Sequence, residues 1–141
     1  MGSTLVPGSA EGTAMVLDEA LSFWGGVDPA TGRVIDQRHP QAGAELAGAI
    51  LVMPSGRGSS SSSSVLAETV RAGTAPAGVI LRDPDPIVAL GAMVAGELYG
   101  AAPPVVVLDG PAYDRIATGD RLRVEAGDGR EPKVSRARGA E

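Results

Sequence analysis

The chain has 141 residues, which fits a single domain with a buried core, and its formal net charge is −5. No basic cluster precedes the carboxyl-terminal tail, which excludes an extended nucleic-acid-binding surface. The chain has no cysteine for a disulfide or a thiolate metal site, and no segment resembles a signal peptide or a membrane span, so we expect a soluble, cytoplasmic protein.

Short apolar runs separated by turns predict strands in the first part of the chain. The Gly- and Ser-rich residues 1–12 predict a loose start, and Thr13–Leu17 is the first predicted strand. A second short strand is expected at Arg33–Asp36. The run Ala49–Met53 has the length of a buried strand, and it ends at Pro54 because proline cannot continue a central strand.

Helical and strand patterns alternate in the middle of the chain. Val65–Ala72 has apolar residues at helical spacing, and Gly73 is the expected helix stop. Gly78–Leu81 and Val105–Leu108 are short apolar runs typical of strands. Between them, Ile87–Leu98 predicts a buried helix that follows two prolines.

The carboxyl-terminal part predicts a hairpin and then a tail. Ile116–Thr118 and Arg121–Glu125 flank a Gly-Asp turn and form the expected hairpin. From Gly127 onward the composition is polar, which predicts disorder. We therefore expect one domain over residues 1–126 and a disordered tail over 127–141. The order of elements favours an α/β fold with mixed sheets, a parallel core and two main helices.

The segment Ser55–Ser64 is the strongest candidate for chemistry, because it lies between a buried strand and a helix. This arrangement collects anions and developing negative charge at the helix N-terminus. Gly56 and Gly58 allow the backbone to approach a ligand closely. Arg57 offers a planar fork for a carboxylate or phosphate, and one serine of Ser61–Ser63 is expected to cap the helix.

Three other interpretations of this segment were weighed. The six-serine run Ser59–Ser64 could be a flexible linker, but neither flanking part is long enough to fold alone. A Walker phosphate loop would end in Gly-Lys-Ser/Thr, which is absent. A nucleophile elbow would need Gly-x-Ser-x-Gly, which is also absent, and His39 alone would have to serve the triad. Spacing therefore predicts an anion-handling loop and nothing finer.

Several stretches together resemble a known family, over roughly residues 8–108. In chain order they are Glu11-Gly12, Leu21–Gly32, His39-Pro40, Leu46–Pro54, Gly56–Ser63, Gly73–Pro76 and Leu90–Ala95. The motifs Phe-Trp-Gly-Gly-Val-Asp-Pro and Gly-Arg-Gly-Ser are specific in combination, whereas either alone would be weak. On these residues the chain resembles the small, swivelling part of the aconitase X family.

The resemblance implies a swivelling β/β/α domain and a hydro-lyase that is active only as a heterodimer with a larger partner chain. A dehydratase needs a Lewis acid to draw off the departing hydroxyl, and this chain has no cysteine to hold a cluster, so the iron–sulfur cluster is expected in the partner. In the family, the first serine after Gly-Lys/Arg-Gly is the proton-abstracting base, which implies Ser59 here. The residues expected to bind substrate are Gly56, Arg57, Gly58, Ser60 and Ser61.

Two substrates are consistent with the resemblance. Members with Phe-Trp-Gly-Gly and a long serine run resemble bacterial cis-3-hydroxy-L-proline dehydratases, which remove the proton beside the carboxylate and expel the 3-hydroxyl. Archaeal members dehydrate 5-phosphomevalonate, and their loops are usually less rich in serine. We favour hydroxyproline on this resemblance alone.

A second group of residues is predicted to line the pocket or contact the partner: Ser22, Phe23, Trp24, Gly25, Gly26, Asp28 and His39. Structural roles are open for several of them, since the aromatic pair could be core and Asp28 could form a turn. A function of another class also stays open, namely a non-catalytic module that binds an anion without a partner.

Overall fold

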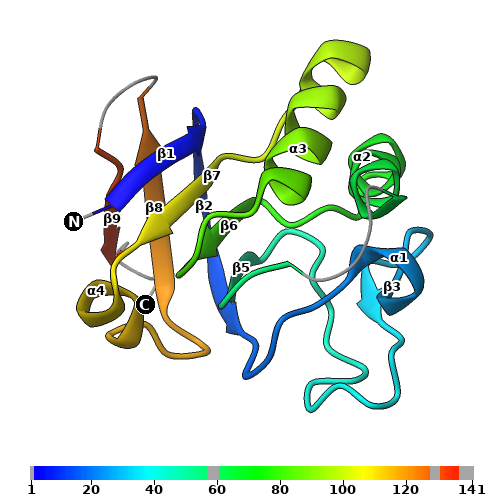
Figure 1. Ribbon diagram of the computed structural model, residues 1–141, viewed down its shortest axis with the longest axis horizontal. Helices are drawn as coiled ribbons and strands as arrows, with labels where there is room; N and C mark the ends of the chain where they lie inside the picture. Colours follow the sequence, from blue (N-terminus) through cyan, green and yellow to red (C-terminus); the bar gives the residue numbers. More distant parts are fainter. Residues whose placement is uncertain (1, 57–60, 128–130, 137–141) are drawn as a thin grey trace.

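The computed structural model describes residues 2–56, 61–127 and 131–136 (Figure 1). Seven strands form one mixed sheet in the order β1-β7-β6-β5-β2-β8-β9. Their bounds are Gly2–Val6 (β1), Gly8–Val16 (β2), Ile50–Met53 (β5), Gly78–Leu81 (β6), Val105–Leu108 (β7), Arg121–Ala126 (β8) and Lys133–Arg136 (β9). A separate pair joins β3 (Val27–Asp28) to β4 (Arg33–Val34).

The centre of the sheet is parallel. The strands β2, β5, β6 and β7 run in one direction, while β1 pairs antiparallel with β7, and β8 with both β2 and β9. Every residue of β5, β6 and β7 is buried. Such continuous apolar runs are expected when both faces of a parallel sheet are covered.

The two faces of the central strands belong to two different apolar clusters. Leu51 packs in a cluster with Leu66 and Val88 from the two long helices. The neighbouring residue Ile50 points to the opposite face, where it packs in a cluster with Leu122 of β8. The sheet therefore separates a helix-covered side from a curled, half-barrel side, as the period of two in a strand requires.

Two of the four helices are long, α2 (Ser61–Ala72) and α3 (Pro86–Tyr99), and the short ones are α1 (Phe23–Gly26) and α4 (Gly110–Asp114). Figure 1 shows α2 and α3 together on one side of the strands, and α4 at the far end beside β8. A Cβ on Gly91 of α3 would lie 2.9 Å from the Ser63 carbonyl oxygen of α2. The glycine thus permits the close contact between the two helices.

Most of the predicted core elements are confirmed. The strands at Gly78–Leu81 and Val105–Leu108 have the predicted bounds, and the run before Pro54 is strand β5. The helix α2 ends at Ala72, and Gly73 has a φ of 77°, which is the left-handed conformation of a helix stop. The α/β fold with a mixed sheet and two main helices is as predicted.

The predicted loose start over residues 1–12 is wrong, because residues 2–6 form β1 and residues 8–12 are the first part of β2. Composition was misleading here, since glycine in a strand often marks a site where another backbone approaches. A Cβ on Gly12 would lie 2.7 Å from the carbonyl oxygen of Gly48. The glycine is therefore a packing requirement within the strand.

The tail differs from the prediction as well. Lys133–Arg136, placed in a disordered segment by its composition, forms β9 and pairs with β8. The expected strand at Ile116–Thr118 is not formed, so the terminal hairpin consists of β8 and β9. Three of the four residues of β9 are exposed, because it is an edge strand, and its polar composition reflects that exposure.

The helix α3 is less buried than predicted. Leu90, Met93 and Leu98 are among its exposed apolar side chains. Its buried residues are small, which lets α3 lie close to α2 and leaves the larger side chains outside. Within the described residues, no helix has the length and apolar character needed to cross a membrane.

Candidate functional site

A cavity of about 350 Å³ lies where β5 and β6 end and α2 and α3 begin. We call it the loop cavity, and its lining includes Leu21, Phe23, Ser55, Gly56, Ser62 and Asp85. These residues come from three separate parts of the chain. Ligands of open α/β sheets bind at the carboxyl ends of the parallel strands, which is where this cavity lies.

Gly56 marks the entry to the predicted loop and lies against the start of α3. It forms an isolated parallel bridge with Leu21. A Cβ at this position would lie 2.4 Å from Asp85 Oδ2 and 2.9 Å from Val88 Cγ2. The absence of a side chain at Gly56 therefore allows close packing against the start of α3, and the predicted approach to a ligand stays a prediction.

Asp85 holds the beginning of α3. Its Oδ1 accepts hydrogen bonds from the backbone N–H groups of Ile87 at 2.8 Å and Val88 at 3.2 Å. This is an N-cap, and the carboxylate also faces the positive end of the helix dipole. Asp85 therefore occupies the N-terminus of α3, whereas α2 begins directly after residues 57–60.

Ser62, in the first turn of α2, contacts the start of α1. Its Oγ accepts a hydrogen bond from the backbone N–H of Trp24 at 3.2 Å and lies 3.1 Å from Ser22 Oγ. The Ser22 hydroxyl in turn donates to the Trp24 carbonyl oxygen at 3.0 Å. Ser62 is buried, with 5% of its surface exposed.

The Phe-Trp-Gly-Gly motif forms a tight turn beside these serines. Trp24 (φ −73°, ψ 116°) and Gly25 (φ 75°, ψ −10°) have the dihedral angles of the central residues of a type II turn, which requires glycine at the second position. Gly26 is buried, and a Cβ there would lie 3.1 Å from Leu21 Cδ1. Phe23 is in the core, and the Trp24 side chain is 62% exposed.

Four predicted site residues, Arg57, Gly58, Ser59 and Ser60, lie outside the described residues. Their neighbours in the sequence are placed, with Gly56 at the loop cavity and Ser61 exposed at the first position of α2. The three serines predicted to supply a cap, Ser61–Ser63, all lie within α2, and the position before the helix is residue 60, outside the described residues.

Two predicted site residues have structural roles away from the loop cavity. Asp28 Oδ1 accepts from the Ala30 backbone N–H at 2.9 Å, within a turn closed at Gly32. His39 is buried, its Nε2 lies 3.1 Å from the Glu19 carbonyl oxygen, and its Nδ1 accepts from the Gln41 N–H at 3.0 Å. Both residues therefore organise turns rather than line the cavity.

The structure adds Ser62, Asp85 and Leu21 to the residues expected from the sequence. A Pro-Asp-Pro motif before an apolar helix is a sequence signal for a cap, and it could have identified Asp85. Ser62 has no distinguishing signal within a run of identical residues. Its role depends on contacts with residues about forty positions earlier in the chain.

No group of three or more His, Asp or Glu side chains that could hold a metal ion is found among the described residues. The sequence has no cysteine, and the ring of its single histidine is engaged with backbone groups. The residues present therefore do not fit an iron–sulfur cluster.

Comparison with known proteins shows which family and which proteins the chain is similar to. Residues 1–131 match the family described as the aconitase X swivel domain. Over 114 residues the chain is 51% identical to a cis-3-hydroxy-L-proline dehydratase of Pseudomonas aeruginosa, which covers 81% of this chain and 20% of that protein. Over 128 residues it is 40% identical to the phosphomevalonate dehydratase small subunit of Methanothermobacter thermautotrophicus, which covers 90% and 91%.

A solved structure has the same fold. Holo-form aconitase X from Thermococcus kodakaraensis superposes with a TM-score of 0.81 at 37% sequence identity, and the match covers 95% of both chains. The chain thus spans about a fifth of the length of the hydroxyproline dehydratase and about nine tenths of the length of the small subunit.

Proposed function

Because the chain belongs to the aconitase X family, as its swivel domain, we propose that it forms the mobile half of a hydro-lyase active site that is completed by a larger aconitase X chain. Ser59 is the proposed proton-abstracting base. The proposed substrate-binding residues around it are Gly56, Arg57, Gly58, Ser60 and Ser61. We also propose a cytoplasmic location for the complex.

One observation carries the proposal: the described residues on either side of 57–60 contact the same short stretch of chain beside the loop cavity. At one end Gly56 bridges to Leu21. At the other end Ser62 holds the backbone of Trp24. A reacting group carried between two anchored ends can be positioned with the accuracy that proton transfer requires.

The proposed chemistry of this chain is removal of a proton from the carbon beside a carboxylate. The C–H electron pair becomes the new carbon–carbon double bond, the proton goes to Ser59 Oγ, and the hydroxyl on the adjacent carbon leaves, so that water is lost overall. A serine hydroxyl is a weak base at neutral pH and needs electrostatic help. Two positive groups are close to Ser59 in the sequence. The N-terminus of α2 begins two residues after it, and the Arg57 guanidinium belongs to the residue two positions before it.

We assign the iron–sulfur cluster to the larger chain, because the residues of this chain do not fit it. The proposed contact of this chain with that partner includes Trp24, whose side chain is 62% exposed beside the loop cavity. An exposed tryptophan at the edge of a functional cavity is typical of an interface anchor. Closure against the partner would also exclude water from the site.

We propose cis-3-hydroxy-L-proline as the substrate, since the relative that is 51% identical bears the name of its dehydratase. Phosphomevalonate is the second candidate, because the small subunit that is 40% identical corresponds to this chain over 91% of its own length. A direct comparison of both substrates decides between them.

The test is to co-express the chain with a large aconitase X chain and to measure turnover of both candidate substrates. Ser59→Ala should lower turnover by at least about 100-fold, the effect expected for loss of a general base, while gel filtration shows an intact complex. Ser64→Ala is the matched control, because Ser64 is exposed on α2, and it should keep full activity.

Three results would contradict parts of the proposal. Absence of a complex, or of turnover with either substrate, would contradict the hydro-lyase function. Full turnover by Ser59→Ala would assign the base elsewhere. Binding of a carboxylate or phosphate by the chain alone, without any turnover in the complex, would favour the non-catalytic anion-binding module.

A further inference from the structure

Ser22, Trp24 and Ser62 form a closed ring of three hydrogen bonds, whose direction follows from the chemistry of the groups. The Trp24 N–H can only donate, and its acceptor is Ser62 Oγ at 3.2 Å. The Trp24 carbonyl can only accept, and its donor is the Ser22 hydroxyl at 3.0 Å. The Ser62 proton is then directed to Ser22 Oγ at 3.1 Å.

Burial makes this ring depend on Ser62. Only 5% of its surface is exposed, so water cannot easily replace its hydroxyl. Removal of a buried partner leaves the remaining groups unsatisfied, which costs more than the bond itself contributed. Ser64, two positions later on the same helix, is exposed. Because of their positions around the helix, Ser62 is buried and Ser64 is exposed to solvent.

The ring joins the exit of the loop to the exposed tryptophan. Ser62 is three residues after Ser59 in the sequence, whereas Trp24 presents 62% of its surface outside. On the other side of the loop, Gly56 bridges to Leu21, immediately before Ser22. A hydrogen-bonded path therefore connects the Trp24 backbone through Ser62 to the first turn of α2.

We propose that Ser62 is a positioning residue, which couples the Trp24 turn to the catalytic loop and so fixes the proton-abstracting serine relative to the partner chain. The inference rests on the proposed hydro-lyase function. Ser62 acts through its hydrogen bonds to Ser22 and Trp24 and does not itself exchange a proton with substrate.

The kinetic test compares Ser62→Ala with Ser64→Ala in the complex with the large chain. Ser62→Ala should lower kcat by about 10–100-fold, because a small displacement of a reacting group has effects of this size, and should leave KM within about twofold. Ser22→Ala should give a similar loss. The double variant should be no worse than the poorer single variant, since both changes open one ring.

The physical test uses Trp24, the only tryptophan of the sequence, in the full chain without a partner. Loss of its backbone hydrogen bonds should lower the steady-state fluorescence anisotropy in Ser62→Ala and Ser22→Ala, and not in Ser64→Ala. Circular dichroism at the same temperature shows that each variant is folded. A purely structural role would lower the melting temperature without the selective loss of kcat.

Two results would overturn the inference. One is a kcat of Ser62→Ala equal to that of Ser64→Ala in an active complex. The other is an additive loss in the double variant, which would mean that Ser22 and Ser62 act separately. If the unaltered complex has no dehydratase activity, the proposed function fails instead, and the anisotropy measurement still decides whether the ring holds Trp24.

Discussion

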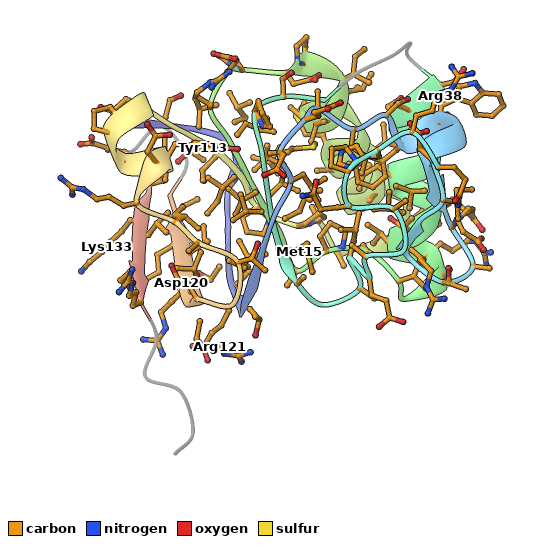
Figure 2. All side chains as sticks on the ribbon, turned by 90° about the horizontal axis from the view of Figure 1, so that it is seen from below. Met15, Arg38, Tyr113, Asp120, Arg121 and Lys133 are labelled. Atoms are coloured by element: carbon orange, nitrogen blue, oxygen red, sulfur yellow. The ribbon has the colours of Figure 1, made fainter. Side chains whose placement is uncertain are left out.

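Two cavities of equal volume, about 350 Å³ each, lie in different parts of the molecule and are built differently. The loop cavity lies beside α1, α2 and α3. The second, which we call the barrel cavity, is lined by residues of β1, β7, α4, β8 and β9 and of the segments beside them, including Leu108, Arg115, Ile116, Leu122, Val134 and Arg136. In Figure 2, the labelled residues Tyr113, Asp120 and Lys133 lie at this end of the molecule, and Arg38 lies at the opposite end beside α1.

Polar groups at the barrel cavity join β9 to the turn before β8, and β1 to the segment before β9. Arg136 Nη2 lies 3.5 Å from Asp120 Oδ2, and the Gly2 backbone N–H donates to Glu131 Oε1 at 3.3 Å. Burial also raises the pKa of Tyr113, which packs inside the half-barrel. This cavity is where the curled sheet brings β1 and β9 together, and its contacts support the fold.

Residues of the loop cavity contact the backbone of segments that are distant in the sequence. Gly56 has space for no side chain, and Ser62 binds a turn about forty residues earlier. Volume alone therefore does not distinguish the proposed functional cavity from the one that supports the fold. The distinction lies in whether the lining residues fix a loop. The predictions below test this distinction, beginning with the largest expected effect.

Gly56→Ala should damage the loop cavity more than any other single methyl group. The added Cβ would lie 2.4 Å from Asp85 Oδ2. Asp85 cannot easily withdraw, because its Oδ1 caps α3 through two backbone N–H groups. The entry of the loop must shift instead, and a displacement of about 1 Å costs about 100-fold in rate. We expect kcat of the complex to fall by about that factor.

The matched control is Gly110→Ala at the start of α4, where an added Cβ meets nothing within 4 Å. This variant should keep full turnover and the same melting temperature within about 2 °C. Equal activity of the two variants would show that the loop cavity tolerates the added methyl group, and the distinction between the cavities would fail.

The central sheet and the two long helices could be predicted from the sequence, because continuous apolar runs and glycine stops are local signals. The strands at the edges of the sheet could not be predicted in this way. The strand β9 has three exposed residues of four, and its composition resembles a disordered tail. Residues 1–12 contain glycines that serve close packing, such as Gly12 against Gly48, and they resemble a flexible start.

For the candidate site too, some residues could be predicted from the sequence and others could not. The family resemblance implies Ser59, which lies outside the described residues, and the strand before the loop indicated Gly56, which lines the loop cavity. The contacts that hold the loop could not be predicted, because Ser62 is one of six identical residues and only the phase of α2 buries it. Its partners Ser22 and Trp24 are joined to it by the tertiary fold alone.

Gly91→Ala tests how far the loop cavity depends on the packing of α2 against α3. The added Cβ would lie 2.9 Å from the Ser63 carbonyl oxygen and 3.0 Å from Leu66 Cδ2. Overpacking of this kind costs about 1–3 kcal/mol, so thermal unfolding should show a melting temperature lower by about 3–10 °C.

Gly96→Ala in the same helix is the control, since its nearest neighbour is the Ala102 Cβ at 3.3 Å and alanine favours helix formation. Its melting temperature should stay within about 3 °C of the unaltered chain or rise. A loss as large as that of Gly91→Ala would mean that the glycine content of α3, rather than the helix contact, sets the stability.

Glu11→Gln should have the smallest effect and belongs to the half-barrel side. Glu11 on β2 accepts hydrogen bonds from Arg123 of β8 at 3.0 and 3.1 Å, and its Oε2 lies 3.5 Å from Arg121 Nη2. The hydrogen bond from Arg123, with the charges of both arginines, lowers the pKa of Glu11 below its ordinary value of 4.5. Exposed ion pairs contribute little, so at pH 7 the melting temperature should fall by no more than about 2 °C.

The direction of the pKa shift determines how this small difference in melting temperature changes with pH. Because the folded state lowers the pKa of Glu11, the carboxylate stabilises the fold above its ordinary pKa, and this contribution is lost as the pH falls through the lowered value. The difference in melting temperature between Glu11→Gln and the unaltered chain should therefore shrink as the pH falls below 4.5. At pH 7 in 1 M NaCl this difference should also shrink, since salt screens exposed charges.

Turnover is the control for this variant. Neither condition should change the ratio of turnover between the Glu11→Gln complex and the unaltered complex wherever both are active, because Glu11 lies on β2 and does not line the loop cavity. A loss of kcat in Glu11→Gln would mean that the half-barrel side also positions the loop, and the two regions would then act as one.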